Sequence, residues 1–177
     1  AANRAVQVGL HRRIGPHHRS GMDFLRSGQV GKIGMAKMFV TGGGSGPESP
    51  SPHGKAPTGM DWDMWCGPAP LRPYCQKLTP GGWRNFLDYA NGTLGDWGVH
   101  WLDQLLWWTE EKYPKSIYST GGRPISGPAV FSNEMGSTTD APDTQTVTYD
   151  FESFTAIWEH RKYGGSAQEK HRVGAYF

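Results

Sequence analysis

The sequence lacks the features that mark several large classes of protein. Two cysteines in 177 residues are too few for a disulfide framework and lack the paired spacing of a zinc ribbon. No apolar run approaches the roughly 20 residues of a membrane-spanning helix, and no signal peptide opens the chain. Basic and acidic residues nearly balance, 18 against 16, without a basic run that would mark nucleic acid or an anionic membrane. We therefore expect no nucleic-acid partner and no membrane partner. The sequence does not decide between a cytoplasmic and a periplasmic compartment.

Glycine, proline and tryptophan are abundant instead. The 25 Gly, 13 Pro and 8 Trp indicate long ordered loops in one domain large enough for a core. Residues 41–82 have almost no periodic pattern, yet Trp62, Trp65 and Tyr74 in this stretch predict that its second half packs over a surface. Cys66 and Cys75 lie in the same stretch, either as one loop disulfide or as free thiols.

Apolar periodicity and turn residues predict the remaining elements. The predicted strands are residues 5–9, 33–39, 116–122, 143–151 and 154–161 and a last one from Val173, and the predicted helices are residues 16–28 and 91 or 93 to about 109. The fourth and fifth strands form an antiparallel hairpin. This order predicts an α+β fold with an open, mainly antiparallel sheet and one long helix across one face.

The long helix carries a polar stripe on an otherwise apolar surface. At about 3.6 residues per turn, Asp96, His100, Asp103 and Gln104 fall within an arc of about 100°, so we expect the stripe to face a cleft. Gly92, Gly95 and Gly98 surround Asp96. Glycine weakens a helix, so three of them indicate that another backbone or a ligand comes close.

Asp96 and His100 stand one helical turn apart. A carboxylate at this spacing holds an imidazole in position and raises its basicity, which suits proton transfer. The alternative is a buried pair with a structural role only, in which each side chain satisfies the hydrogen-bonding groups of the other. No metal site is predicted, because the seven His do not stand at useful spacings from further ligands. No dinucleotide loop is predicted either, because "TGGGSGP" leads into prolines instead of a helix.

Several stretches resemble a known family. "GTLGDWGVHWLD" is similar to a Gly-rich segment leading into D-x-G-x-H-x-x-D, with Asp96, Gly98, His100 and Asp103 at the matching positions. "VQVGLHRR" resembles the last strand of a Rossmann domain, and "FLRSGQVGKIGMAKMF" the crossing helix and first sheet strand that follow. The chain is thus similar to the Gfo/Idh/MocA oxidoreductases, which join an N-terminal Rossmann domain to a C-terminal α/β domain.

The resemblance implies a domain division and a function. Residues 1–15 would be the last strand of a dinucleotide-binding domain, and residues 16–177 a substrate-binding and oligomerisation domain that is incomplete at its C-terminal end. The implied function is the substrate-binding part of an NAD(P)-dependent oxidoreductase acting on a sugar, cyclitol or related polyol. The alternatives are an NAD-dependent glycosidase of the same family and a non-catalytic binding or dimerisation module.

The resemblance also assigns residues. His100 would take the hydroxyl proton of the substrate and Asp96 would orient His100, while Arg12 and Arg13 would approach the NAD or NADP. The residues implied to contact the carbohydrate-like substrate are Trp83, Arg84, Asn91 and Asp103.

The family's Gly-rich dinucleotide loop and E-K-P lysine are not in the sequence. We therefore expect this chain alone neither to bind NAD(P) tightly nor to transfer hydride. We expect a homo-oligomer through the open sheet, because Val147, Tyr149 and Ile157 would otherwise form an exposed apolar patch.

Overall fold

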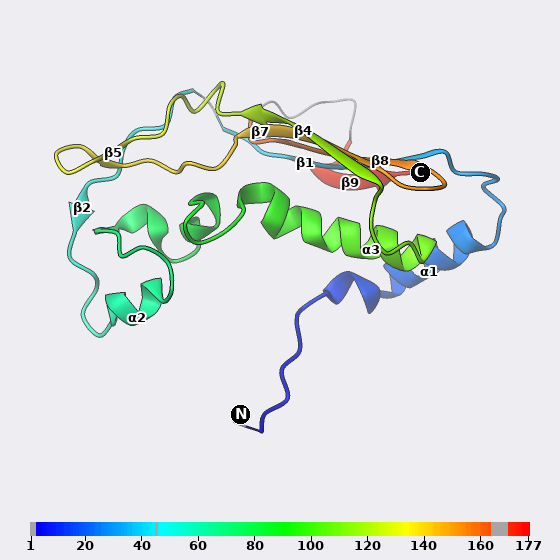
Figure 1. Ribbon diagram of the computed structural model, residues 1–177, viewed down its shortest axis with the longest axis horizontal. Coiled ribbons are helices and arrows are strands. Elements are labelled where there is room, and N and C mark those ends of the chain that lie inside the picture. Colours follow the sequence, from blue (N-terminus) through cyan, green and yellow to red (C-terminus); the bar gives the residue numbers. More distant parts are fainter. Residues whose placement is uncertain (1–2, 45, 164–169) are drawn as a thin grey trace.

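A five-stranded sheet with two helices beneath one face forms the main body of the molecule (Figure 1). The computed structural model describes residues 3–44, 46–163 and 170–177. The strand order is β4-β7-β8-β1-β9, in which β1 and β8 are parallel and the other neighbours antiparallel. The strands are β1 (Met35–Thr41), β4 (Ser116–Gly122), β7 (Thr144–Asp150), β8 (Thr155–Arg161) and β9 (Val173–Tyr176). The predicted α+β fold is confirmed.

Two helices lie under this sheet, α1 (Pro16–Arg26) and α3 (Val99–Thr109). Pro16 begins α1 at a position where its missing N–H costs nothing. A π-helical turn, Leu94–Gly98, leads into α3, so the predicted helix has the expected extent but a wider first turn. Gly98 lets this turn approach the sheet, because a Cβ there would lie 2.9 Å from Leu94 and 3.7 Å from the Trp158 ring.

The main core lies between α3 and the sheet. Alternate residues of each strand point towards the helix, as the two-residue period of a strand requires. Trp158 of β8 is fully buried at its centre. The buried members of this core are Ala36, Met38, Trp101, Leu105, Val147, Tyr149, Phe151, Phe154, Ala156 and Trp158.

This arrangement corrects two predictions about which side chains are covered. Val147 and Tyr149, expected on an exposed patch, are 2% and 7% exposed because they face α3. Gln104, expected on the cleft-facing stripe, is 5% exposed. The Gln104 amide hydrogen-bonds His18 Nδ1 at 2.9 Å, since α1 packs over that part of α3.

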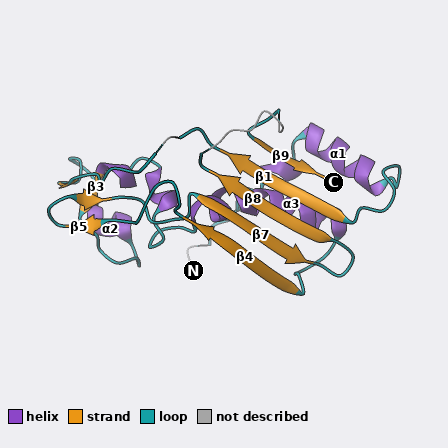
Figure 2. Cartoon of the chain, turned by 90° about the horizontal axis from the view of Figure 1, so that it is seen from above, coloured by secondary structure: helices purple, strands orange, loops and turns teal. Residues whose placement is uncertain are grey.

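Residues 42–44 and 46–90 build a second, smaller packed region beside the sheet (Figure 2). The prediction of an almost structureless stretch is wrong here: it contains β2 (His53–Gly54), α2 (Trp62–Cys66) and β3 (Tyr74–Cys75). The predicted packing of its aromatic half is confirmed. Cys75, Leu78 and Phe86 form a buried cluster under Trp62, Trp65, Trp83 and Tyr89. Asp61 caps α2 by accepting a hydrogen bond from the Met64 N–H at 3.0 Å.

A short hairpin extends the same region. Its strands are β5 (Phe131–Ser132) and β6 (Gly136–Ser137). Ser51, at the far end of the loop after β1, forms a bridge to Ser137, which ties the two segments together. Cys66 and Cys75 are both buried free thiols, so the disulfide alternative does not hold.

The strand predicted at residues 5–9 does not form. Residues 3–10 have no strand hydrogen bonds, and the side chains of Val6 and Val8 are 90% and 77% exposed. A strand needs a neighbour to pair with, and the described part of the chain offers none there. None of the helices in the described residues is long and apolar enough to cross a membrane.

Candidate active site

A cavity of about 640 Å³ opens where the π-helical turn meets α3. It brings together five residues predicted to act on or bind the substrate: Trp83, Arg84, Asn91, Asp96 and His100. Residues 8–10, at the start of the chain, line the same cavity. Segments far apart in the sequence therefore meet at the residue predicted to move a proton.

His100 is the titratable side chain at the α3 end of this cavity. Burial lowers the pKa of His100, and the nearby His11 and Arg12 lower it further, against the opposing effects of Asp96 and Asp103. Its Nδ1 is buried without a hydrogen-bond partner among the described residues. An imidazole with a lowered pKa is neutral at neutral pH, the form that accepts a proton.

Asp96 reaches a different partner from the predicted one. Its carboxylate accepts a hydrogen bond from Arg84 Nε at 3.0 Å, and no hydrogen bond to His100 joins the two among the residues described. The wider π-helical turn moves Asp96 off the line that an α-helix would give it. Its negative charge still raises the pKa of His100, so Asp96 influences His100 through space.

Arg84 and Trp83 form one wall of the cavity. The Arg84 guanidinium lies 4.6 Å from the centre of the Trp83 ring, and its pairing with Asp96 holds it towards the π-helical turn. An aromatic face beside paired polar groups suits a ligand with apolar faces and hydroxyl edges.

Arg13 and Asp103 pair with each other. Arg13 donates two hydrogen bonds to the Asp103 carboxylate, at 2.8 and 2.6 Å. Neither residue lines the cavity around His100. The pair fastens the helical turn His11–Arg13 to α3, which keeps His11 beside His100.

Arg12 occupies the interior side of the same turn. Its guanidinium lies 4.0 Å from the centre of the Trp101 ring, and Nη1 is 3.3 Å from His18 Nε2. Its Nε is buried with no hydrogen-bond partner among the described residues, and burial lowers the pKa of Arg12.

His11 is a member of the site that the sequence did not single out. Its ring centre is 4.6 Å from that of His100. The only sequence signal was its position next to Arg12 and Arg13, two residues that the family resemblance implied.

Comparisons with known proteins agree with this fold. Residues 42–119 match a family model described as "Oxidoreductase family, C-terminal alpha/beta domain". The match covers less than half of the chain, and over these residues the chain is similar to the C-terminal α/β domain of that oxidoreductase family. The predicted resemblance to the Gfo/Idh/MocA oxidoreductases is confirmed over these residues. A search of curated proteins finds no match.

Solved structures share the fold at low sequence identity. A super-repressor mutant of Gal80p from Saccharomyces cerevisiae has a TM-score of 0.57 at 12% identity, over 98% of this chain and 39% of that one. An oxidoreductase from Thermotoga maritima has a TM-score of 0.53 at 14% identity, over 93% and 39%. A putative NADPH-dependent oxidoreductase from Desulfitobacterium hafniense has a TM-score of 0.52 at 14% identity, over 89% and 34%. The chain spans between a third and two fifths of the length of these structures.

Proposed function

We propose that this chain is the substrate-binding part of an NAD(P)-dependent oxidoreductase that acts on a sugar, cyclitol or related polyol, with His100 as the proton acceptor. One observation carries the proposal: the partly buried imidazole of His100, whose pKa is lowered by burial, stands in a cavity with Trp83, Arg84 and Asn91. A polyol offers hydroxyl groups to the polar side chains and a C–H face to the indole.

The chain's own residues perform three tasks in this proposal. Trp83, Arg84 and Asn91 bind and orient the substrate ring. His100 accepts the proton of the reacting hydroxyl, and its lowered pKa keeps it ready to do so at neutral pH. The Asp96 carboxylate, held by Arg84, favours the imidazolium that forms, because a negative charge stabilises a nearby positive one.

A nicotinamide cofactor would supply the hydride acceptor for the carbon that carries this hydroxyl. The described residues are suited to contact such a cofactor. They do not form a complete binding site for it. After β1 the chain continues through loop residues 42–44 and 46–52 instead of a Gly-rich turn and a helix, so no phosphate cradle forms there. Arg12, with its unpartnered Nε, is the residue we assign to the cofactor side, whereas the Arg13 charge is matched by Asp103.

The direct test uses the full-length protein. Purified protein should be supplied with NAD or NADP and a panel of sugars, cyclitols and polyols, and cofactor reduction followed by absorbance. We expect saturable reduction with at least one of them. Cleavage of an aryl glycoside without net cofactor reduction would support the glycosidase alternative, and binding of a sugar without either reaction would support a non-catalytic module.

A further inference from the structure

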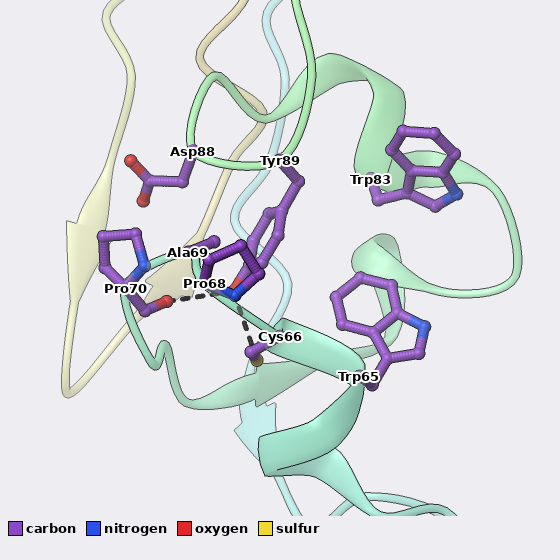
Figure 3. Close-up of a pocket in the computed structure, with 8 residues that line it drawn as sticks. All are labelled: Trp65, Cys66, Pro68, Ala69, Pro70, Trp83, Asp88 and Tyr89. Atoms are coloured by element: carbon purple, nitrogen blue, oxygen red, sulfur yellow. Dashed lines mark hydrogen bonds between the residues drawn. The ribbon is translucent and has the colours of Figure 1, made fainter. Parts of the chain in front are cut away.

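A second cavity, of about 680 Å³, is drawn in Figure 3. It adjoins the cavity around His100, because Trp83 lines both. Two segments of the chain contribute the lining. One is α2 with the turn after it, and the other is residues 83–89, which lead towards the π-helical turn. The lining residues are Trp65, Cys66, Pro68, Ala69, Pro70, Trp83, Asp88 and Tyr89. Apart from Trp83, none of these residues has a role in the proposed reaction at His100.

One wall is aromatic and firmly supported. Trp65 stacks on Trp62 with ring centres 4.6 Å apart and planes at 14°, and Tyr89 packs against Trp65 at 5.2 Å. These rings rest on the buried cluster around Phe86. The Trp62 Nε1 also donates a hydrogen bond to the Arg72 carbonyl at 2.8 Å. Such rings present a preformed flat surface, which lowers the entropy cost of binding a flat apolar face.

The side of the cavity opposite Trp65 combines apolar and polar groups. Figure 3 shows Pro70 and Asp88 across the cavity from Trp65 and Trp83. The Asp88 carboxylate pairs with Arg72, so its charge is matched, while its oxygens remain hydrogen-bond acceptors near the rim. None of the described residues that line this cavity is a Lys or Arg, which disfavours an anionic ligand. A neutral ligand with apolar faces and hydroxyl edges suits this lining.

Trp83 lines both cavities. A ring bound at His100 and a ring bound against Trp65 would therefore share one indole as a common wall. We propose that the second cavity binds a further sugar ring of the substrate, so that the preferred substrate is a di- or oligosaccharide instead of a free monosaccharide. This inference rests on the proposed function and narrows its substrate class.

The test compares two substrates in the full-length protein. One is a monosaccharide that the protein oxidises, and the other a disaccharide that carries the same ring at its non-reducing end. We expect a higher kcat/KM for the disaccharide. In Trp65→Ala the ratio of the two kcat/KM values should fall about tenfold, as loss of an aromatic stacking surface implies. Trp65→Tyr should recover most of the ratio, because the ring is retained.

Trp107→Ala is the matched control, because Trp107 lies on α3 and lines neither cavity. It should leave the ratio unchanged. The thermal midpoint of each variant shows whether it folds, and fluorescence titration with both sugars measures binding apart from turnover. An unchanged ratio in folded Trp65→Ala, or a wild-type protein that prefers the monosaccharide, overturns the inference while the proposed function stands. Oxidation of a cyclitol or another polyol but of no sugar also overturns the inference alone, whereas failure to bind or oxidise any sugar, cyclitol or polyol overturns both.

Discussion

At the residue scale, the site depends on how its environment sets the pKa of one histidine. Burial lowers the pKa of His100, and Asp96 works in the opposite direction. The sequence spacing predicted that Asp96 and His100 influence each other, and the structure retains this influence without a hydrogen bond between them. The spacing could not predict Arg84 as the partner of Asp96, because that contact depends on a turn twelve residues earlier and on the π-helical geometry.

Replacement of Asp96 tests its electrostatic role. Asp96→Asn removes a charge that raises the pKa of His100, so the pKa should fall and the neutral base should persist to lower pH. The acidic limb of the kcat/KM profile of the full-length enzyme should therefore move to lower pH, and turnover should fall less than in a variant without His100.

Asp23→Asn is the control for this change, because Asp23 is an exposed carboxylate of α1. Its pH profile should match that of the wild type. If Asp96→Asn loses activity only in proportion to a loss of folded protein, with the acidic limb in place, the carboxylate is a structural group.

At the element scale, the sequence predicted those helices and strands that local periodicity determines. The alternation in residues 143–151 and 154–161 predicted β7 and β8, and Pro16 predicted the start of α1. The strand predicted at residues 5–9 failed, because a strand also depends on a neighbour that no local pattern encodes. The elements α2, β2 and β3 were missed for a related reason: all three are short. Contacts with Phe86 and its cluster hold α2 and β3, and pairing with β3 holds β2.

Glu48 fastens the long loop to the segment that precedes β7. Burial alone would raise the pKa of this carboxyl, but hydrogen bonds from Lys77, Thr139 and Arg123 outweigh it and lower the pKa to about 2. The side chain is 11% exposed, so water screens these contacts little.

Glu48→Gln should lower the free energy of unfolding by about 2 to 3 kcal/mol at neutral pH. The ionised Glu48 stabilises the fold fully above its ordinary pKa of 4.5, and this contribution is lost as the pH falls towards 2. Urea unfolding at about pH 7 and about pH 3 should show a smaller pH dependence in the variant. The exposed Glu134→Gln should behave like the wild type, and equal stability of all three proteins at neutral pH would refute the role of Glu48.

At the scale of the whole molecule, no helix formed by residues 3–44, 46–163 or 170–177 covers the face of the sheet away from α3 (Figures 1 and 2). We call this surface the open face. Strand pairing places Tyr118, Thr148, Ile157, Lys37 and Tyr176 in one row across it. The side chains of Tyr118 and Tyr176 are among the exposed apolar groups. We propose that a second copy of the chain covers this face.

Tyr118→Lys should weaken self-association, because it places a charge among the apolar groups of that interface. Analytical ultracentrifugation over a concentration series should show a dimer for the wild type and a higher dissociation constant for the variant. Tyr113→Lys, at an equally exposed position in the turn after α3, should not change association. A wild-type chain that remains monomeric at the highest concentration would rule out the interface.

This 177-residue chain on its own should not bind NADH tightly, since the part of it that the structure describes forms no Gly-rich phosphate loop before a helix. Titration with NADH, followed by quenching of the tryptophan fluorescence, should give no saturable signal. The full-length protein under the same conditions is the positive control. Saturable binding by the short chain in the micromolar range would show that it holds a cofactor site of its own.

Replacement of His100 tests the central claim most directly. In the full-length enzyme with its best polyol substrate, His100→Ala should lower kcat by roughly 10² to 10⁴-fold, the usual contribution of a general base. The thermal midpoint should stay close to that of the wild type, and His171→Ala, at an exposed position, should keep full activity. A His100→Ala protein that folds normally and turns over at nearly the wild-type rate would contradict the assignment of His100 as the proton acceptor.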